Sequence, residues 1–165
     1  MIARLTLLTT IFLASTCLAS DQRIIVGDGN PNLAEGARQM IAGHDEKGIE
    51  LTLLGLQVAN GKREEEIALS NLCAGYTNLG DYERALKYCD VLLLRNDKSW
   101  RAYNSKALIY INTKQYDQAE SALLKGEAIN PDARSMKIAR ALFLDATQPV
   151  VPEIEVDDRQ KPVEH

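Results

Sequence analysis

The stretch LSNLCAGY at residues 69–76 is followed, 34 positions later, by YNSKALIY at residues 103–110. Both stretches begin with a large residue and continue with a small residue, Cys73 or Ala107, and then a tyrosine. The same offset relates four further pairs downstream: Tyr82 and Tyr116, Ala85 and Ala119, Cys89 and Leu123, and Asp97 and Pro131. Self-similarity at a fixed period of this length is typical of arrays of helix–turn–helix repeats.

The segments that follow the two stretches are the most specific part of the pattern. They read GDYERAL at residues 80–86 and QYDQA at residues 115–119. With them, the two repeats resemble tetratricopeptide repeats. The resemblance implies that each repeat is a pair of antiparallel helices and that the first helices line a concave groove that faces a protein or peptide ligand.

The spacing of apolar residues in the middle repeat predicts helices directly. Positions i, i+3, i+4, i+7 and i+10 form one face of a helix, and these positions hold Leu69, Leu72, Cys73, Tyr76 and Leu79. A comparable stripe begins at Tyr82, after Asp81 as the expected N-cap. In the last repeat Lys106 replaces the usual leucine, and we expect its ammonium group to reach water along its stem.

A third, degenerate copy precedes these two. We expect helices at residues 33–41 and 48–59, with a turn at Gly43, and three inserted residues within residues 60–65. Small residues recur at equivalent positions of the three copies: Gly36, Cys73 and Ala107 in the first helices, and Gly48, Ala85 and Ala119 in the second. Small side chains allow two helices to approach to about 8 Å.

The sequence therefore predicts an all-α protein, a short α-solenoid of antiparallel helical hairpins with a closing helix. The predicted tetratricopeptide-like domain spans residues 32–146. Its parts are a degenerate repeat at 32–65, repeats at 66–99 and 100–133, and a closing helix at 134–146. Because repeat stacks need a capped end, the closing helix is expected to turn four residues inward: Met136, Ala139, Leu142 and Phe143.

Both ends of the chain differ from the repeats. Residues 1–19, with Arg4 before an apolar stretch, have the layout of a secretory signal peptide cleaved after Ala19, and lipidation of Cys17 is the alternative. Residues 20–31 are expected to form an extended arm, in which Ile24–Val26 either packs on the first helices or stays solvated. Residues 147–165, proline-containing and acidic, predict an extended or disordered tail.

Composition and motifs exclude several classes of function. The 165 residues include 19 basic and 23 acidic ones, a formal net charge of -4, and no basic cluster suits nucleic acid. His44 and His165 lie far apart in sequence, and no metal-ligand spacing, phosphate loop or nucleophile motif is present. The acids at 64–66 suit a helix N-terminus. We therefore expect no enzyme activity, cofactor, metal or nucleic-acid partner.

The candidate ligand residues lie on the first helices, away from the packing stripe. The tyrosines of the repeats occupy packing positions, so polar residues are the better candidates. By the resemblance, the groove residues are Asn71, Asn78, Arg101, Asn104, Ser105 and Asn112. Asn side chains can donate to and accept from a peptide backbone, and Arg can hold a carboxylate. The alternative is an ordinary polar surface.

The two cysteines of the middle repeat predict a disulfide. Cys73 and Cys89 are equidistant from the turn at Gly80 and Asp81, so their side chains should meet inside one antiparallel hairpin. Bridged Cα atoms usually lie within about 6.8 Å, closer than most packed helices come. Two buried free thiols that act as small hydrophobic groups are the alternative.

These features together indicate a binding protein. We expect a protein- or peptide-binding adaptor or scaffold of the bacterial cell envelope, exported to the periplasm, monomeric, and without a membrane span in the mature chain. Two other classes stay open. One is a thiol-disulfide redox protein that uses Cys73 and Cys89, and the other is a structural subunit that assembles through its repeat ends.

Overall fold

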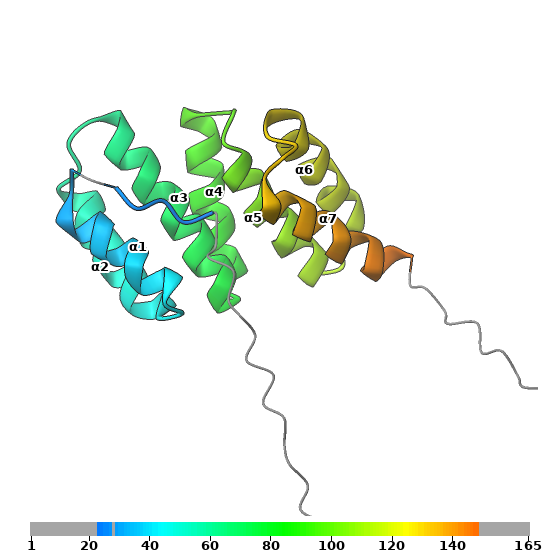
Figure 1. Cartoon of the computed structure of the whole chain (residues 1–165), viewed down its shortest axis with the longest axis horizontal. Coiled ribbons are helices and arrows are strands. Elements are labelled where there is room, and N and C mark those ends of the chain that lie inside the picture. Colours follow the sequence, from blue (N-terminus) through cyan, green and yellow to red (C-terminus); the bar gives the residue numbers. More distant parts are fainter. Residues whose placement is uncertain (1–22, 28, 149–165) are drawn as a thin grey trace, which may run out of the picture.

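The computed structural model describes residues 23–27 and 29–148, and in this part of the chain it contains seven helices and no strand (Figure 1). The helices are α1 (Pro31–Ile41), α2 (Asp45–Gln57), α3 (Lys62–Leu79), α4 (Tyr82–Arg95), α5 (Trp100–Asn112), α6 (Tyr116–Ile129) and α7 (Arg134–Thr147). The predicted signal peptide and almost all of the predicted tail lie outside the described residues.

Three helical hairpins, α1–α2, α3–α4 and α5–α6, stack along the molecule, and α7 packs against α5 and α6 (Figure 1). The first helices are neighbours, because α3 contacts both α1 and α5. The prediction of an all-α solenoid of antiparallel hairpins is confirmed. Local signals begin the helices: the Asn30 side chain accepts hydrogen bonds from the backbone N–H groups of Asn32 and Leu33, and Pro31 occupies the first position of α1.

Close contact between small residues holds the first hairpin together. A Cβ atom on Gly36 of α1 would lie 2.6 Å from Oγ1 of Thr52 and 2.8 Å from the carbonyl oxygen of Gly48 in α2. A methyl group therefore has no room between these helices. The equivalent small residues of the other hairpins are also buried: Cys73, Ala85, Ala107 and Ala119.

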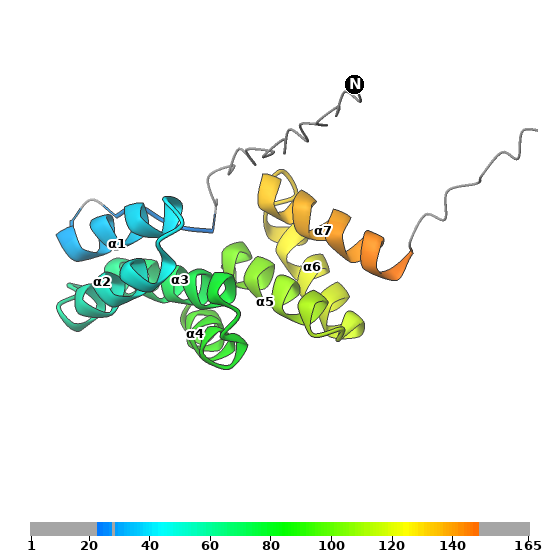
Figure 2. The same cartoon turned by 90° about the horizontal axis from the view of Figure 1, so that it is seen from below.

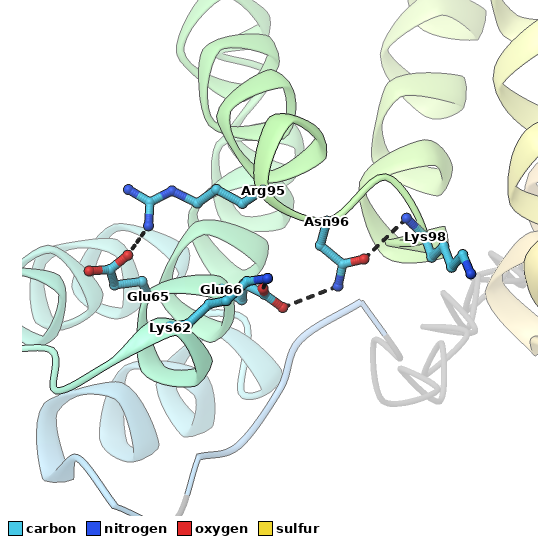
Figure 3. A network of polar contacts seen from close by, with 6 residues as sticks. All are labelled: Lys62, Glu65, Glu66, Arg95, Asn96 and Lys98. Atoms are coloured by element: carbon cyan, nitrogen blue, oxygen red, sulfur yellow. Dashed lines mark hydrogen bonds and ion pairs between the residues drawn. The ribbon is translucent and has the colours of Figure 1, made fainter.

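Most of the segment in which we expect the inserted residues is helical. Residues 62–65 belong to α3, which has 18 residues against 13 in α5. The added turns contact the end of α4 (Figure 3): Glu65 pairs with Arg95, and the Asn96 side chain donates to Glu66 at 3.1 Å. Such partly exposed pairs contribute little stability individually, but they position the connection between α4 and α5.

The closing helix buries Met136, Ala139 and Phe143 as predicted, but the prediction for Leu142 is wrong. Leu142 is 47% exposed, because α7 has only one covered face. Lys106 also differs from expectation, since its ammonium group pairs with Asp90 of α4. Burial disfavours its charge, but the Asp90 hydrogen bond and nearby Tyr110 outweigh burial and raise the pKa of Lys106.

Cys73 of α3 and Cys89 of α4 meet inside the middle hairpin. Their Cα atoms are 5.0 Å apart, and their sulfur atoms lie at bonding distance. The helices thus come close enough for the bridge, and the geometry is compatible with the predicted disulfide. Both side chains are buried, at 1% and 0% exposure. The equivalent pair in the last hairpin is Ala107 and Leu123.

We predict that the exported protein, unfolded without reductant, contains no free thiol from Cys73 or Cys89. Reduction should lower the free energy of unfolding by about 3 kcal/mol, because a loop of this length is released in the unfolded chain. Thiol counting and denaturant unfolding with and without reductant measure both effects. The matched control, Cys73→Ala with Cys89→Leu, copies the last hairpin and should be insensitive to reductant. Two free thiols in the unreduced protein would rule out the bridge.

We also predict that Gly36→Ala lowers the free energy of unfolding by about 1–3 kcal/mol, because the new methyl group meets backbone atoms of α2. In an open helix the same change would stabilise the protein by about 0.5–1 kcal/mol. Gly126→Ala is the control: its methyl group would meet only the flexible end of Met136 at the closest points, so its cost should be smaller. Equal or increased stability of Gly36→Ala would contradict the close-packing argument.

Candidate functional site

The inner sides of the first helices form the candidate site. In Figure 2, α3 and α5 form a floor, and α1 and α7 rise beside it on the same side. We call this surface the concave face. Residues 23–27, which we call the arm, run across it from the start of α1 over α3 (Figures 1 and 2).

The backbone of the arm is bound by one side-chain amide. The Ile25 N–H group donates to Oδ1 of Asn71 at 2.7 Å, and Nδ2 of Asn71 donates to the Ile25 carbonyl oxygen at 2.8 Å. In an extended residue the N–H and C=O groups point to the same side, as in a paired β-strand. Asn71 therefore acts as a clamp for an extended backbone, the chemistry that the sequence predicted for it.

The arm also inserts a charged side chain into the concave face. Arg23 is only 7% exposed, and its guanidinium group donates to Oδ1 of Asn78 in α3 and to Oγ of Ser105 in α5 at 3.5 Å. Ser70 donates to the Arg23 carbonyl oxygen at 3.4 Å. Arg23 thus connects two neighbouring repeats.

Between these polar contacts, an aliphatic side chain of the arm packs into the core. Ile24 is 7% exposed and belongs to an apolar cluster that includes Met40, Leu72 and Ile109. Val26, two positions on, is 50% exposed. The packed alternative for this segment is therefore confirmed for Ile24.

The six predicted groove residues divide into two groups. Asn71 and Ser105 hold the arm, and Asn104 is buried beneath α7, where it donates to the Ser135 carbonyl oxygen at 2.9 Å. The expectation that these three face an open groove is wrong, because the arm and α7 cover them. The other three are accessible: Asn78, which also accepts from Arg23 of the arm, and Arg101 and Asn112. Their contact with a partner stays a prediction.

Arg23 and Ile24 are the site residues that the sequence analysis did not select. The sequence feature that could have identified them is a β-branched run after a basic residue, because such a run indicates an extended segment. The run is too short for its periodicity to show which helix it contacts.

A cavity of about 300 Å³ adjoins the arm, between α3 and α5. Ile25 forms one wall, and Trp100 and Arg101 line it as well. Arg101 stacks on Trp100, with Cζ 4.4 Å from the ring centroid, and burial lowers the pKa of Arg101, which remains charged at neutral pH. Asn96 and Lys98 also line this cavity. The Lys98 backbone N–H group donates to the Asn96 side chain, as Figure 3 shows. An aromatic ring beside a cation can receive a partner's carboxylate or apolar group.

A second cavity of about 410 Å³ lies between α4, α5 and α6. Tyr103, Tyr110 and Lys125 line it together with Lys106, which is neutralised by Asp90. Among residues 23–27 and 29–148 no group of acids, histidines and cysteines could hold a metal ion. In the same residues no helix has the length and apolar character required to cross a bilayer.

The comparison with known protein families matches this architecture. Residues 101–133, which contain the third hairpin except its first residue, match the family model described as a tetratricopeptide repeat. Among curated proteins and among solved structures no match was found. The third hairpin is therefore similar to a tetratricopeptide repeat, and the described chain as a whole is an all-α solenoid of that type.

Proposed function

We propose that this protein is an adaptor or scaffold that binds an extended segment of a partner protein on its concave face. Tetratricopeptide repeats generally mediate protein–protein interactions, which supports the binding role. The observation that carries the proposal is the pair of hydrogen bonds between Asn71 and the Ile25 backbone. The concave face already holds an extended peptide segment, which is supplied by the chain itself.

The accessible polar residues extend this binding surface: Asn78 already accepts from Arg23 of the arm, and Arg101 and Asn112 add polar groups on α5. Asn78 and Asn112 occupy equivalent positions on α3 and α5, and Arg101 lies at the other end of α5 beside Trp100. A partner segment that crosses both helices would meet amides and a guanidinium group, which bind backbone and carboxylate groups. This supports a protein ligand rather than a small substrate, and we propose that the protein has no enzyme activity.

The proposed location is the cell envelope, with the periplasm as the compartment and a lipid anchor on Cys17 as the alternative. The bridge between Cys73 and Cys89 supports export, because structural disulfides persist in oxidising compartments. The burial of both sulfur-bearing side chains disfavours the redox alternative, since thiol exchange requires an accessible sulfur.

A structural role through the repeat ends has one supporting observation. The surface of α7 exposes three large aliphatic side chains: Ile138 at 47%, Leu142 at 47% and Leu144 at 42%. Sedimentation distinguishes the two functions, because assembly through α7 gives oligomers and binding on the concave face leaves a monomer.

We predict that Arg101→Ala with Asn112→Ala weakens capture of the partner from envelope extract by ten- to a hundredfold. Losing a charge-assisted contact costs about 1.5–3 kcal/mol, and neither change opens the core, because neither side chain is fully buried. Asn104→Ala is unsuitable for this test because Asn104 is fully buried.

The control for this capture experiment is Lys87→Ala, an exposed position of α4. In Figure 2, α4 lies on the other side of α3 from the arm. Circular dichroism should show unchanged helicity in both variants. Equal capture by the double variant and the control would show that the partner binds elsewhere.

We predict that the protein purified from its native host begins at Ser20 or Asp21. N-terminal sequencing and intact mass measure this directly. An intact Met1, or a diacylglycerol group on Cys17, would contradict the proposed release into the periplasm.

A further inference from the structure

We infer that the arm is a built-in competitor of the partner, and that the partner segment has the same chemistry as the arm: an extended strand with a basic residue directly before two aliphatic residues. This inference rests on the proposed function, because it takes the concave face as the binding site. Three neighbouring subsites, each occupied by one arm residue, define the expected segment.

The first subsite selects the basic residue. The Arg23 guanidinium group donates to Oδ1 of Asn78 and to Oγ of Ser105. Nδ2 of Asn78 donates to Asp45 of α2 at 3.0 Å, which turns the amide oxygen toward the arginine. The acceptors and the nearby carboxylate favour a cation, and two repeats at fixed spacing favour the planar, multidentate guanidinium group over lysine.

The second subsite selects an aliphatic side chain. Ile24 belongs to one apolar cluster that also contains Met40 of α1, Leu72 of α3 and Ile109 of α5. A polar or charged residue here would be buried without a partner of its own, which costs at least 1–3 kcal/mol. The requirement thus arises from three first helices at once, not from one repeat.

The third subsite is independent of side-chain identity. Asn71 binds only the N–H and C=O groups of Ile25, so any extended residue except proline satisfies it. The Ile25 side chain packs against the cluster of Leu33, Ile67 and Ala68 and forms a wall of the cavity beside Trp100. A second aliphatic residue is therefore favoured at this position.

The covalent connection makes the arm a strong competitor. The arm joins α1 at Asn30, whose side chain caps that helix and donates to the Gly55 carbonyl oxygen at 3.0 Å. A short tether gives an effective concentration in the millimolar range. A separate segment with the same chemistry can therefore bind only molecules whose arm is undocked, and its apparent affinity is reduced by that fraction.

The experiment uses the protein purified after export and a fluorescent, amidated peptide with the sequence of residues 21–27, DQRIIVG. The full chain with Arg23→Ala and Ile24→Ser should bind the peptide at least tenfold more tightly than the unchanged protein, because its own arm competes poorly. Arg23→Ala alone is the second variant, in case the double change disturbs folding. In either background Asn78→Ala should weaken peptide binding at least fivefold, and Lys87→Ala on the exposed surface of α4 should not.

Peptide specificity gives the remaining outcomes. Replacing the arginine of the peptide with glutamate should reduce its affinity at least tenfold, and replacing it with lysine should have a smaller effect. The inference is overturned if a folded arm variant does not bind the peptide at millimolar concentration, or if the unchanged protein binds it equally well. Partner capture from extract does not use this peptide, so it tests the proposed function separately.

Discussion

The structure depends on how closely the two helices of each hairpin approach. At the closest point of the first hairpin, Gly36 faces Gly48, and even a methyl group on either residue would meet a backbone oxygen of the other helix at 2.8 Å. Cys73 and Ala85, and Ala107 and Ala119, occupy the same positions in the next hairpins. This constraint sets the distance between helices, and the bridge between Cys73 and Cys89 is possible only because that distance is short.

The short distance between the two helices of each hairpin also explains why the concave face can hold an extended segment. Since each hairpin is thin, the first helices α1, α3 and α5 become neighbours, and residues from all three contribute to one surface. The arm uses this surface fully: Asn71 binds its backbone, Ile24 enters the cluster shared by the three helices, and Arg23 contacts both α3 and α5. A ligand site that spans several repeats can select the ligand residue at several positions at once, which a single repeat cannot do.

The partner is therefore expected to meet a surface that is already occupied. Displacing the arm releases polar atoms of Asn71 and Ser105 that are otherwise buried, and buried polar atoms need replacement hydrogen bonds. A partner segment that supplies the same groups loses little, whereas one that lacks them leaves these atoms unpaired. Selectivity then follows from the free-energy cost of hydrogen bonds that a partner fails to replace. A partner must bind more favourably than the arm in order to displace it.

The sequence by itself determined the repeat period, the three hairpins, the closing helix and the meeting of Cys73 with Cys89, because these follow from contacts between residues close in the chain or at one fixed offset. It also selected Asn71 as one of six candidate groove residues. Only the tertiary structure decided what Asn71 binds: Ile25 lies 46 positions away, and a three-residue β-branched run carries no periodicity that would reveal its contacts. Likewise, polar residues such as Asn104 can face either water or another helix, and the packing of α7 decided that Asn104 is buried.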